Sequence, residues 1–257
     1  MYLEKFDLKG CNAVVTGGGR AIGLACCMAL AEAGAHVVIA DRDPEVCETG
    51  KAELAQAGFQ AESVVLDVTD SPAVSRVANE LNARLGSIDI LVNNAGIARS
   101  GVAAEDVTDE HWLNVLDVNL NGTFWCAREF GRHMLGRGRG SVVNIGSMSG
   151  FIVNKPQKQS FYNASKAAVH HLTRSLAAEW AERGVRVNAV APTYIDTPLN
   201  RFGMEDESLS RTWLEMTPMN RIGRTDEIAS VVLFLASEAA SLMTGSIVLA
   251  DGGYVCW

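Results

Sequence analysis

Apolar and polar positions divide the chain into short runs rich in β-branched residues and longer segments whose apolar residues recur at helical spacing. Several of the short runs are apolar throughout rather than alternating, a pattern typical of strands that are covered on both faces. The runs that we predict to be strands are Cys11–Thr16, His36–Ala40, Ala61–Leu66, Ile88–Val92, Ser141–Ile145, Val185–Val190 and Ser246–Leu249.

Helices are predicted between these strands. Asp43-Pro44 and Asp70-Ser71-Pro72 support two of the helix starts, because aspartate caps a helix N-terminus and proline fits its first turn. The predicted helices are Ile22–Ala33, Glu45–Ala57, Ala73–Leu85, Glu110–Leu135, Phe161–Arg183 and Asp226–Ser237.

Strands and helices alternate over nearly the whole chain, which predicts right-handed βαβ crossovers and an α/β fold. We expect a Rossmann-like, doubly wound parallel sheet of about seven strands with helices on both faces. No linker or repeat divides residues 1–257, so we predict one domain, with a cofactor half at about 8–145 and a catalytic and substrate half at about 146–257. Residues 193–224 break the alternation and are too long for an ordinary connection, so we expect a lid there.

Composition narrows the possible function classes. The 257 residues carry a net charge of −8 and are 48% apolar, which argues against a disordered chain and against nucleic acid or an anionic membrane as a partner. The six cysteines show no paired spacing and no metal-binding pattern with histidine. We therefore predict reduced thiols, no metal site and, since the N-terminus lacks a signal-peptide core, a cytoplasmic protein.

The segment Thr16-Gly-Gly-Gly-Arg-Ala-Ile-Gly23 follows the first predicted strand and runs into a helix. Glycines let the backbone turn sharply there and approach a pyrophosphate, whose charge the helix N-terminus stabilises. A glycine-rich turn without a ligand is the alternative. Asp41, which closes the second strand, favours a dinucleotide because a carboxylate at that position binds the hydroxyls of the adenosine ribose.

Asp41 also bears on the choice between NAD and NADP. At roughly 4 Å and an effective dielectric constant of about 20, one charge pair is worth about 4 kcal/mol. A carboxylate would therefore repel a 2′-phosphate, whereas it accepts hydrogen bonds from a free diol. Arg20 and Arg42 count in the other direction, because either could approach a phosphate, although Arg42 could instead cover the adenine ring. We predict NAD, with NADP as the alternative.

Tyr162 and Lys166 lie four residues apart at the start of a long predicted helix, so their side chains share one face. A tyrosine is a poor base at neutral pH because its pKa is near 10. We expect the ammonium group, together with the positive ring of an oxidised nicotinamide, to lower that pKa and make the phenol an acid–base catalyst. Taken alone, the pair could be a chance feature of a surface helix.

Together, these motifs resemble the short-chain dehydrogenase/reductase family from Leu8 to Tyr254. The matching segments are Thr16-Gly17…Gly23, Asp67-Val68, Asn93-Asn-Ala-Gly96, Val118-Asn-Leu-Asn-Gly122, Ser147, Tyr162…Lys166 and Asp251-Gly-Gly253. The resemblance implies an NAD(P)-dependent oxidoreductase that interconverts a secondary alcohol and a ketone. It also implies a catalytic tetrad, whose members are Asn119, Ser147, Tyr162 and Lys166.

The resemblance assigns a role to each of these positions. Ser147 would hold the substrate oxygen and Tyr162 would exchange its proton. Lys166 would bind the nicotinamide ribose, and Asn119 would keep a relay water in line. The residues implied to bind the cofactor are Gly17, Gly19, Arg20, Ile22, Gly23, Asp41, Arg42, Asp67, Val68, Asn94, Ala95, Gly96, Tyr162, Lys166, Pro192, Ile195 and Thr197.

Three departures from the family pattern mark this chain. Ala21 replaces the second glycine of the loop, where a methyl group fits if φ is negative. A threonine follows Pro192 where the family has glycine, close to the expected nicotinamide position. Ser147 and Tyr162 are fifteen positions apart, two more than the common family spacing, and the extra length lies in Phe151–Ser160, which should border the substrate.

That segment offers Ser149, Asn154 and Gln157 as hydrogen-bonding groups, and buried partners of this kind discriminate for hydroxyl-rich ligands. With residues 95–99 and 251–257, the segment resembles bacterial polyol dehydrogenases of the galactitol type. The resemblance implies a galactitol- or sorbitol-like sugar alcohol as substrate. The side chains implied to contact it are Ser147, Ser149, Asn154 and Tyr162. For Ser149 and Asn154, a loop that satisfies its own backbone is the alternative.

Two rival functions are weighed against this interpretation. A 3-oxoacyl-[acyl-carrier-protein] reductase shares the tetrad, but usually uses NADP and a basic entrance for its acidic carrier, and Asp41 and the negative net charge count against both. A non-enzymatic NAD-sensing module predicts decay of Tyr162 or Lys166, and both residues are present.

Other features have weaker interpretations. Trp213, Met216 and Met219 could wall a pocket, although their helical spacing favours a core. For the pair His170-His171 we expect packing or a subunit contact. The resemblance implies a homotetramer, with one interface at Glu110–Leu135 and the catalytic helix and another at the C-terminal strand and tail. Some relatives hold a structural Mg²⁺ near the C-terminal carboxylate, which nothing else in the sequence indicates.

Overall fold

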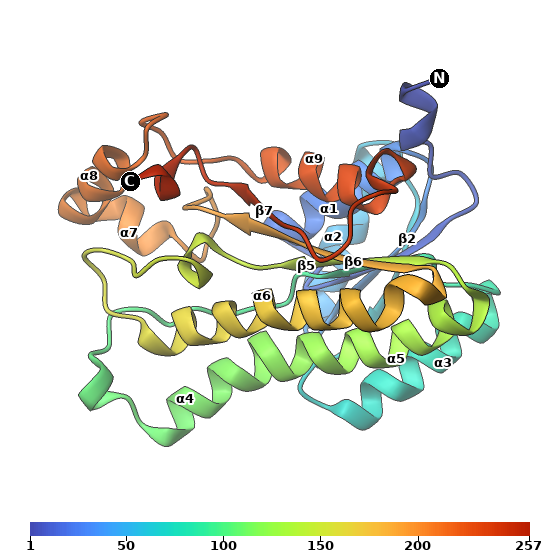
Figure 1. The fold of residues 1–257 in the computed structure, drawn as a ribbon, viewed down its shortest axis with the longest axis horizontal. Coiled ribbons are helices and arrows are strands. Elements are labelled where there is room, and N and C mark those ends of the chain that lie inside the picture. Colours follow the sequence, from blue (N-terminus) through green and yellow to red (C-terminus); the bar gives the residue numbers. More distant parts are fainter.

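Seven parallel strands form one sheet in the order β3-β2-β1-β4-β5-β6-β7, in a computed structural model that describes residues 1–257 (Figure 1). The strands are β1 (Asn12–Thr16), β2 (His36–Asp41), β3 (Ala61–Val65), β4 (Ile90–Asn93), β5 (Gly140–Ile145), β6 (Val185–Pro192) and β7 (Ile247–Ala250). The chain winds outward from β1 to β3 and then returns to β4. The winding direction therefore reverses between β1 and β4, and ligands bind at such a point beside the carboxyl ends of the strands.

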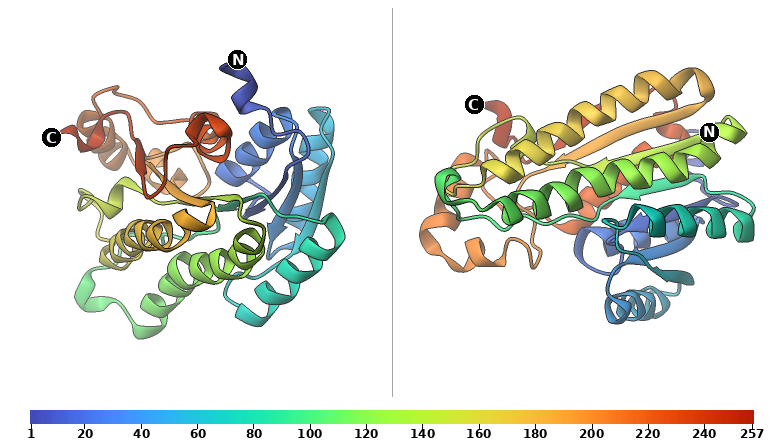
Figure 2. Two further views of the ribbon diagram at one scale, coloured as in Figure 1. Left: turned by 45° about the vertical axis from the view of Figure 1, so that its right-hand side comes forward. Right: turned by 90° about the horizontal axis from the view of Figure 1, so that it is seen from below.

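Helices cover both faces of the sheet (Figures 1 and 2). The helices are α1 (Ala21–Glu32), α2 (Pro44–Gln56), α3 (Ser71–Leu85), α4 (Asp109–Leu116), α5 (Gly122–Arg137), α6 (Ser160–Trp180), α7 (Arg201–Glu205), α8 (Glu207–Met216) and α9 (Thr225–Ala236). α1, α2 and α9 share one buried core with the sheet, and α3, α5 and α6 share the other. The predicted doubly wound α/β fold is confirmed. None of these helices combines the length and the apolar character that a membrane span requires.

Local chemistry fixes two of the helix starts as predicted. The Asp43 carboxylate accepts the backbone N–H of Glu45 at 2.9 Å, and the Asp70 carboxylate accepts that of Ala73 at 2.9 Å. Each helix also has a proline in its first turn, where the missing N–H would have no partner within the helix.

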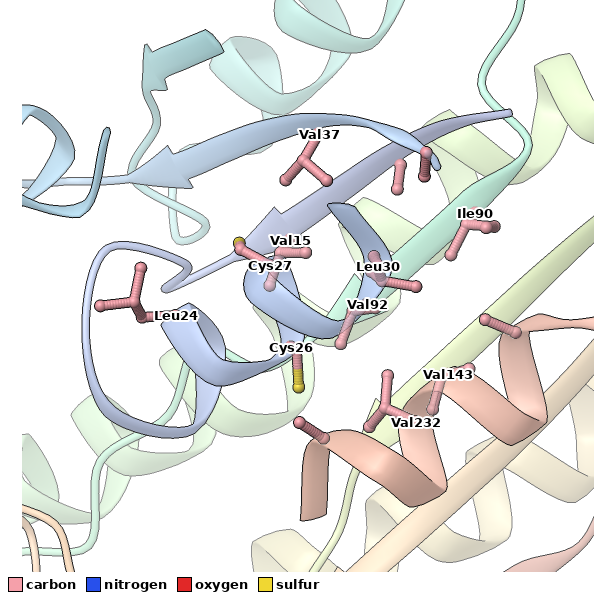
Figure 3. Packing of buried hydrophobic residues seen from close by; sticks show 14 of the residues in the cluster. Val15, Leu24, Cys26, Cys27, Leu30, Val37, Ile90, Val92, Val143 and Val232 are labelled. Carbon is pink, nitrogen blue, oxygen red and sulfur yellow. The ribbon is translucent and has the colours of Figure 1, made fainter. Parts of the chain in front are cut away.

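The core on the α1 side forms between β1, β4, α1 and α9 (Figure 3). Cys26 of α1 is fully buried there beside Val232 of α9, and burial raises the pKa of its thiol to about 12. Cys126 of α5 is fully buried on the other face of the sheet. Both thiols therefore serve as small apolar side chains of the core.

The predicted single helix Glu110–Leu135 is wrong in one respect. A π-helical segment, Asp117–Asn121, lies between α4 and α5, and such segments widen a helix by one residue and are frequent at functional sites. The hydrophobic pattern on each side is helical, so the sequence does not show the interruption. The segment carries Asn119, one of the four residues of the predicted tetrad.

The predicted lid at 193–224 contains α7 and α8 and encloses a small core of its own. Trp213 is fully buried and stacks on Tyr194, with ring centroids 3.8 Å apart. A bridge between Ile195 and Gly223 joins the two ends of the segment. The core interpretation of Trp213 is therefore confirmed, whereas Met219 is 64% exposed.

Candidate active site

A cavity of about 440 Å³ opens at the carboxyl ends of the strands, where the winding direction reverses. It brings together nearly every predicted site residue. Those that line it are Gly17, Arg20, Ile22, Gly23, Asp41, Arg42, Asp67, Val68, Asn94, Ala95, Gly96, Ser147, Ser149, Asn154, Tyr162, Lys166, Pro192, Ile195 and Thr197. Gly19 and Asn119 do not line it, and both have structural partners elsewhere.

The glycine-rich loop is shaped by close backbone contacts. Gly17 has a φ of 60°, and a Cβ on Gly23 would lie 2.1 Å from the Gly17 carbonyl oxygen. Only glycine fits at Gly23, because real Cβ atoms do not approach an oxygen so closely. A Cβ on Gly19 would lie 2.5 Å from the carbonyl oxygen of Val46. Gly19 therefore lets the loop pack closely against α2, and its predicted contact with the cofactor stays a prediction.

Ala21 has a φ of 50°, so the condition under which we expected its methyl group to fit is not met. A residue with a side chain is destabilised by about 1–2 kcal/mol in this left-handed region. Ala21 begins α1, whose N-terminus has no side-chain cap and no acidic residue in its first turn. Ala21, Ile22 and Gly23 of that turn line the cavity, and an uncapped helix N-terminus suits an anion, so the loop fits a pyrophosphate.

The adenosine end of the cavity carries charges with few partners. Asp41 is half-buried and accepts one backbone N–H, from the residue two positions later, at 3.3 Å. Arg20 and Arg42 are exposed, and neither forms an ion pair with another side chain. Asp67 accepts the N–H and the hydroxyl of Thr69 at 2.8 and 2.7 Å through one oxygen. The second carboxylate oxygen of Asp67 and most of the Asp41 carboxylate are free to accept hydrogen bonds.

Asn94 joins the ends of β1 and β4 below the centre of the cavity. Its amide nitrogen donates to the carbonyl oxygens of Thr16 and Gly17 at 3.0 and 2.9 Å. The Thr16 hydroxyl in turn accepts the backbone N–H groups of Asn94 and Ala95 at 3.0 and 3.1 Å. Asn94 thus supports the central region of the cavity by fixing the glycine-rich loop.

Lys166 lies on α6 with its ammonium group inside the molecule. The side chain is 5% exposed, and Nζ donates to the carbonyl oxygen of Ile145 at 2.8 Å and lies 5.8 Å from the ring centre of Tyr162. Burial lowers the pKa of Lys166 to about 8 and raises that of Tyr162, with the Ser147 hydroxyl lowering the latter in part. In the chain alone the pKa of Tyr162 therefore lies above its ordinary value because burial dominates. The expected lowering by Lys166 together with an oxidised nicotinamide stays a prediction.

Ser147 sits in a turn that a histidine supports from below. Its hydroxyl accepts the N–H of Ser149 at 3.1 Å, and its own N–H donates to Nε2 of His170 at 3.4 Å. Gly146 and Gly150 leave room for the imidazole, since a Cβ on either would lie 2.5 Å from the ring. His170 is 3% exposed, and burial and nearby positive charges lower its pKa to about 4. A neutral His170 therefore packs beneath Ser147, as the packing interpretation predicts.

Asn119 joins three elements through its side-chain amide. Its Oδ1 accepts the N–H of Ile97 at 2.9 Å, while its Nδ2 donates to the Ile97 carbonyl at 2.9 Å and to the Ser165 hydroxyl at 3.0 Å. The π-helical segment aims the amide at the loop after β4 and at α6. These bonds hold the floor of the site, and the predicted part of Asn119 in holding a relay water stays a prediction.

The sequence patterns do not identify Gln159, which is 6% exposed and joins several walls of the cavity. Its Nε2 donates to Oδ1 of Asn154 at 2.9 Å and to Oδ1 of Asn163 at 3.1 Å. Its Oε1 accepts the hydroxyl of Ser100 at 2.7 Å. Ser100 lies far away in the sequence, so no local motif could have predicted this contact.

Asn154 and Gln157 meet at the hydroxyl of Tyr194. The amide nitrogen of Asn154 donates to it at 3.0 Å and that of Gln157 at 2.8 Å, and Trp213 donates its indole N–H to Oε1 of Gln157 at 3.2 Å. The two amides therefore bind other side chains rather than the backbone of their own loop. Asn154 and Ser149 are buried, at 6% and 4% exposed.

Charge is unevenly distributed along the cavity. The ionisable acidic and basic side chains that line it are Arg20, Asp41, Arg42, Asp67 and Lys166. All but Lys166 belong to the adenosine end, and the ammonium of Lys166 is held by a backbone carbonyl. The opposite end is lined by hydroxyl, amide and apolar groups without a free cation.

Comparison with known proteins accounts for this arrangement. A family profile described as enoyl-(acyl carrier protein) reductase matches residues 17–255. Galactitol 2-dehydrogenase of Rhizobium johnstonii is 57% identical over 256 residues, which cover 100% of this chain and 99% of the relative. The chain belongs to the short-chain dehydrogenase/reductase family. Sorbose reductase of Schizosaccharomyces pombe is 40% identical over 97% of each chain.

Solved structures of the family superpose over the full length of the chain. The crystal structure of gox2181 has 54% sequence identity and a TM-score of 0.98, with 100% of both chains covered. A gluconate 5-dehydrogenase from Burkholderia cenocepacia, solved in complex with NADP and tartrate, has 38% identity and a TM-score of 0.95 over 100% of both chains. As a member of the short-chain dehydrogenase/reductase family, the protein is an oxidoreductase with a nicotinamide cofactor, and the glycine-rich loop and the free α1 N-terminus fit that cofactor.

Proposed function

We propose that the protein is an NAD-dependent polyol dehydrogenase that interconverts a sugar alcohol of the galactitol or sorbitol type and its ketose. The observation that carries this proposal is the neutral, hydrogen-bonding lining of the substrate end of the cavity. A sugar acid would bring a carboxylate into that end, where no cation is free to pair with it. A neutral polyol matches the hydroxyl and amide groups of Ser149, Asn154 and Gln159.

The family roles of Ser147, Tyr162 and Lys166 suit this reaction. A bound oxidised nicotinamide would supply the acceptor for the hydride of the carbinol carbon. Ser147 holds the substrate oxygen, and the phenolate of Tyr162 takes the hydroxyl proton as the carbonyl forms. Because burial raises the pKa of Tyr162, a positive charge besides that of Lys166 has to favour the phenolate during oxidation. Reduction of the ketose runs these proton steps in reverse.

The preference for NAD over NADP rests on Asp41. Its carboxylate is free to accept hydrogen bonds from the ribose diol and would repel a 2′-phosphate. Exposed Arg20 and Arg42 weaken that repulsion. The comparison of kcat/KM for the two cofactors tests the assignment, and a higher value for NADP would overturn it.

A substrate panel tests the function. Purified protein is offered galactitol, sorbitol, pentitols, short diols and gluconate with NAD, and formation of NADH is measured. We expect the highest kcat/KM for a hexitol. A preference for gluconate would contradict the argument from the neutral lining. Faster reduction of an acetoacetyl thioester with NADPH would instead support the 3-oxoacyl carrier-protein reductase, and binding of NAD without any turnover would support a sensing module.

We also propose that the enzyme is a homotetramer in the reducing cytoplasm. Large apolar side chains are exposed on the expected interface of α4 and α5, including Trp112, Leu113 and Phe124, and at the C-terminus Trp257 is 76% exposed. All six cysteines are free, as in a reducing compartment. Light scattering after size exclusion should give about four times the chain mass of 27.5 kDa.

A further inference from the structure

The segment that precedes α6 is held in place by side chains rather than by its backbone. From Val153 to Lys158 the main chain forms a single hydrogen bond to other backbone groups, in which the carbonyl oxygen of Lys158 accepts the N–H of Gly101 at 2.9 Å. The side chain of Val153 is 84% exposed and buries little surface. The position of Asn154, which the family resemblance implies to contact the substrate, therefore depends on hydrogen bonds of its own side chain.

Gln159 supplies one of these hydrogen bonds and connects two walls of the cavity. On one side its amide lies 2.9 Å from Oδ1 of Asn154 and 3.5 Å from the hydroxyl of Ser149. On the other side the amide lies 2.7 Å from the hydroxyl of Ser100, in the loop after β4. A fourth contact, at 3.1 Å, reaches Oδ1 of Asn163 in α6. Ser100, Ser149 and Asn154 line the cavity, whereas Asn163 does not.

This bridge does not depend on which way round the amide of Gln159 lies. The serine hydroxyls can each donate or accept, and the amides of Asn154 and Asn163 can rotate to offer either oxygen or nitrogen. In both orientations Gln159 contacts the same four side chains. Gln159 is 6% exposed and its amide is surrounded by these partners, so its main effect on a ligand is through the side chains that it holds.

Without the amide of Gln159, the two side chains on the substrate wall would lose a partner in a buried place. Asn154 and Ser149 are 6% and 4% exposed, and a buried polar group without a partner is destabilised. Asn154 would keep only the hydroxyl of Tyr194, at 3.0 Å. Since no backbone hydrogen bond fixes the chain at Asn154, its amide would then be free to reorient.

We propose that Gln159 is a positioning residue that holds Asn154 and Ser149 against the loop after β4 and thereby sets the affinity of the enzyme for polyols. This inference rests on the proposed polyol dehydrogenase function. A polyol benefits from groups that are fixed before it binds, because less entropy is then lost on binding. An alcohol with only the reacting hydroxyl makes no use of these groups, so Gln159 favours hexitols over short alcohols.

Gln159→Leu removes the amide and keeps a side chain of similar size. The measurement is the ratio of kcat/KM for galactitol to that for 2-butanol, each with NAD. We expect this ratio to fall about tenfold through a higher KM for galactitol, the effect of hydrogen bonds lost in a buried site. The kcat for galactitol and the affinity for NAD should stay near those of wild type, because the bridge acts on substrate binding. An unchanged ratio, including one in which both substrates lose activity equally, would overturn the proposal, and so would a fall that lies in kcat alone.

Asn163→Ala is the matched control, because it removes the contact of Gln159 with α6 and leaves the three contacts that border the cavity. We expect the wild-type ratio in this variant. If Asn163→Ala and Gln159→Leu lower the ratio equally, Gln159 supports the start of α6 rather than the substrate wall, and the proposal fails.

Ser100→Ala tests whether Gln159 connects the two walls. This variant removes the anchor of Gln159 on the loop after β4, and we expect the ratio to fall about threefold. When Ser100→Ala is combined with Gln159→Leu, the ratio should equal that of Gln159→Leu alone, since both substitutions break the same bridge. A ratio lowered by the two factors together would show that the residues act independently, which would overturn the proposed bridge.

These outcomes also separate the role of Gln159 from the proposed function. If the wild-type enzyme oxidises no polyol, the proposed function fails and the role of Gln159 fails with it. If the wild-type enzyme oxidises hexitols and Gln159→Leu keeps the wild-type ratio, only the role of Gln159 is rejected.

Discussion

The adenosine end and the substrate end of the cavity are built in different ways. At the adenosine end, glycines and free helix N–H groups shape the backbone, and Arg20, Asp41 and Arg42 have few partners in the protein. At the substrate end, the side chains from Ser100 to Trp213 are joined to one another by hydrogen bonds. The adenosine end is formed mainly by backbone and binds the same cofactor in every turnover. The substrate end is formed mainly by side chains and selects among substrates.

This difference determines how each end responds to substitution. A backbone surface tolerates no added Cβ, but single side chains on it can be exchanged with local consequences. In a connected side-chain surface, one substitution changes the orientation of neighbours that do not touch it, because each amide is oriented by the next. The following predictions test this distinction, from the largest expected effect to the smallest.

Tyr162→Phe, at the junction of the two ends, should lower kcat about 10²- to 10⁴-fold, since it deletes the acid–base group. Affinity for NAD, measured by quenching of tryptophan fluorescence, should stay near that of wild type because the phenol hydroxyl does not shape the glycine-rich loop. Retention of near-wild-type kcat would overturn the catalytic assignment.

Gly23→Ala should weaken NAD binding about 100-fold or more, because the new Cβ would lie 2.1 Å from the Gly17 oxygen and the loop would have to shift. Fluorescence titration with NAD provides the measurement, and thermal unfolding shows whether the fold survives. Gly136→Ala is the control: a Cβ there meets nothing within 4 Å, so binding should be unchanged and α5 slightly stabilised. Equal behaviour of the two variants would contradict the backbone description of this end.

Asp41→Asn should shift the ratio of kcat/KM for NADP to that for NAD upward by about 10- to 100-fold. The substitution removes a half-buried charge that would repel the 2′-phosphate, and solvent screening keeps the effect below the full Coulomb estimate. The ratio of kcat/KM for galactitol to that for 2-butanol, each measured with NAD, should not change. A change in substrate preference would show that the two ends are coupled more strongly than their construction suggests.

His170→Leu should lower kcat about fivefold, the effect of one weak hydrogen bond to the backbone of Ser147. Affinity for NAD should be unaffected, and His170→Gln should restore part of kcat because its amide oxygen reaches the position of Nε2 and can accept the same N–H. If both variants lose NAD affinity along with kcat, His170 supports the fold in general rather than the position of Ser147.

The same histidine predicts a loss of stability in acid. Because its pKa is about 4 in the folded protein and 6.5 ordinarily, the unfolded chain binds more protons between those values, and stability falls as the pH is lowered through this window. The contribution is on the order of 3 kcal/mol. The free energy of unfolding of wild type and of His170→Leu is measured with denaturant at pH 7 and pH 4. An equal loss of stability between the two pH values in both proteins would contradict the assignment.

The sequence predicts the adenosine end well because its signals are local. Thr16–Gly23 is one continuous segment, and contacts with each other and with adjacent elements require its glycines. Two details escape prediction. The left-handed φ of Ala21 depends on the path of the loop in space, and the close packing of Gly19 depends on Val46 in a separate helix.

The substrate end was predictable only in part. Ser149 and Asn154 follow from the family resemblance, but Ser100 and Gln159 are far apart in the sequence and meet only when β4 and β5 pair. The raised pKa of Tyr162 was missed for a related reason. Four-residue spacing shows which charge is near, but the depth of burial that outweighs it is a property of the whole fold.

The π-helical segment Asp117–Asn121 changes the helical phase between α4 and α5. An α-helix advances by about 100° per residue, so one additional residue rotates everything after it by that angle about the common axis. α4 and α5 consequently turn different sides toward α6 than one uninterrupted helix would. Deleting one residue here would rotate the apolar face of α5 out of the core. The packing of α4, α5 and α6 therefore constrains the length of this segment.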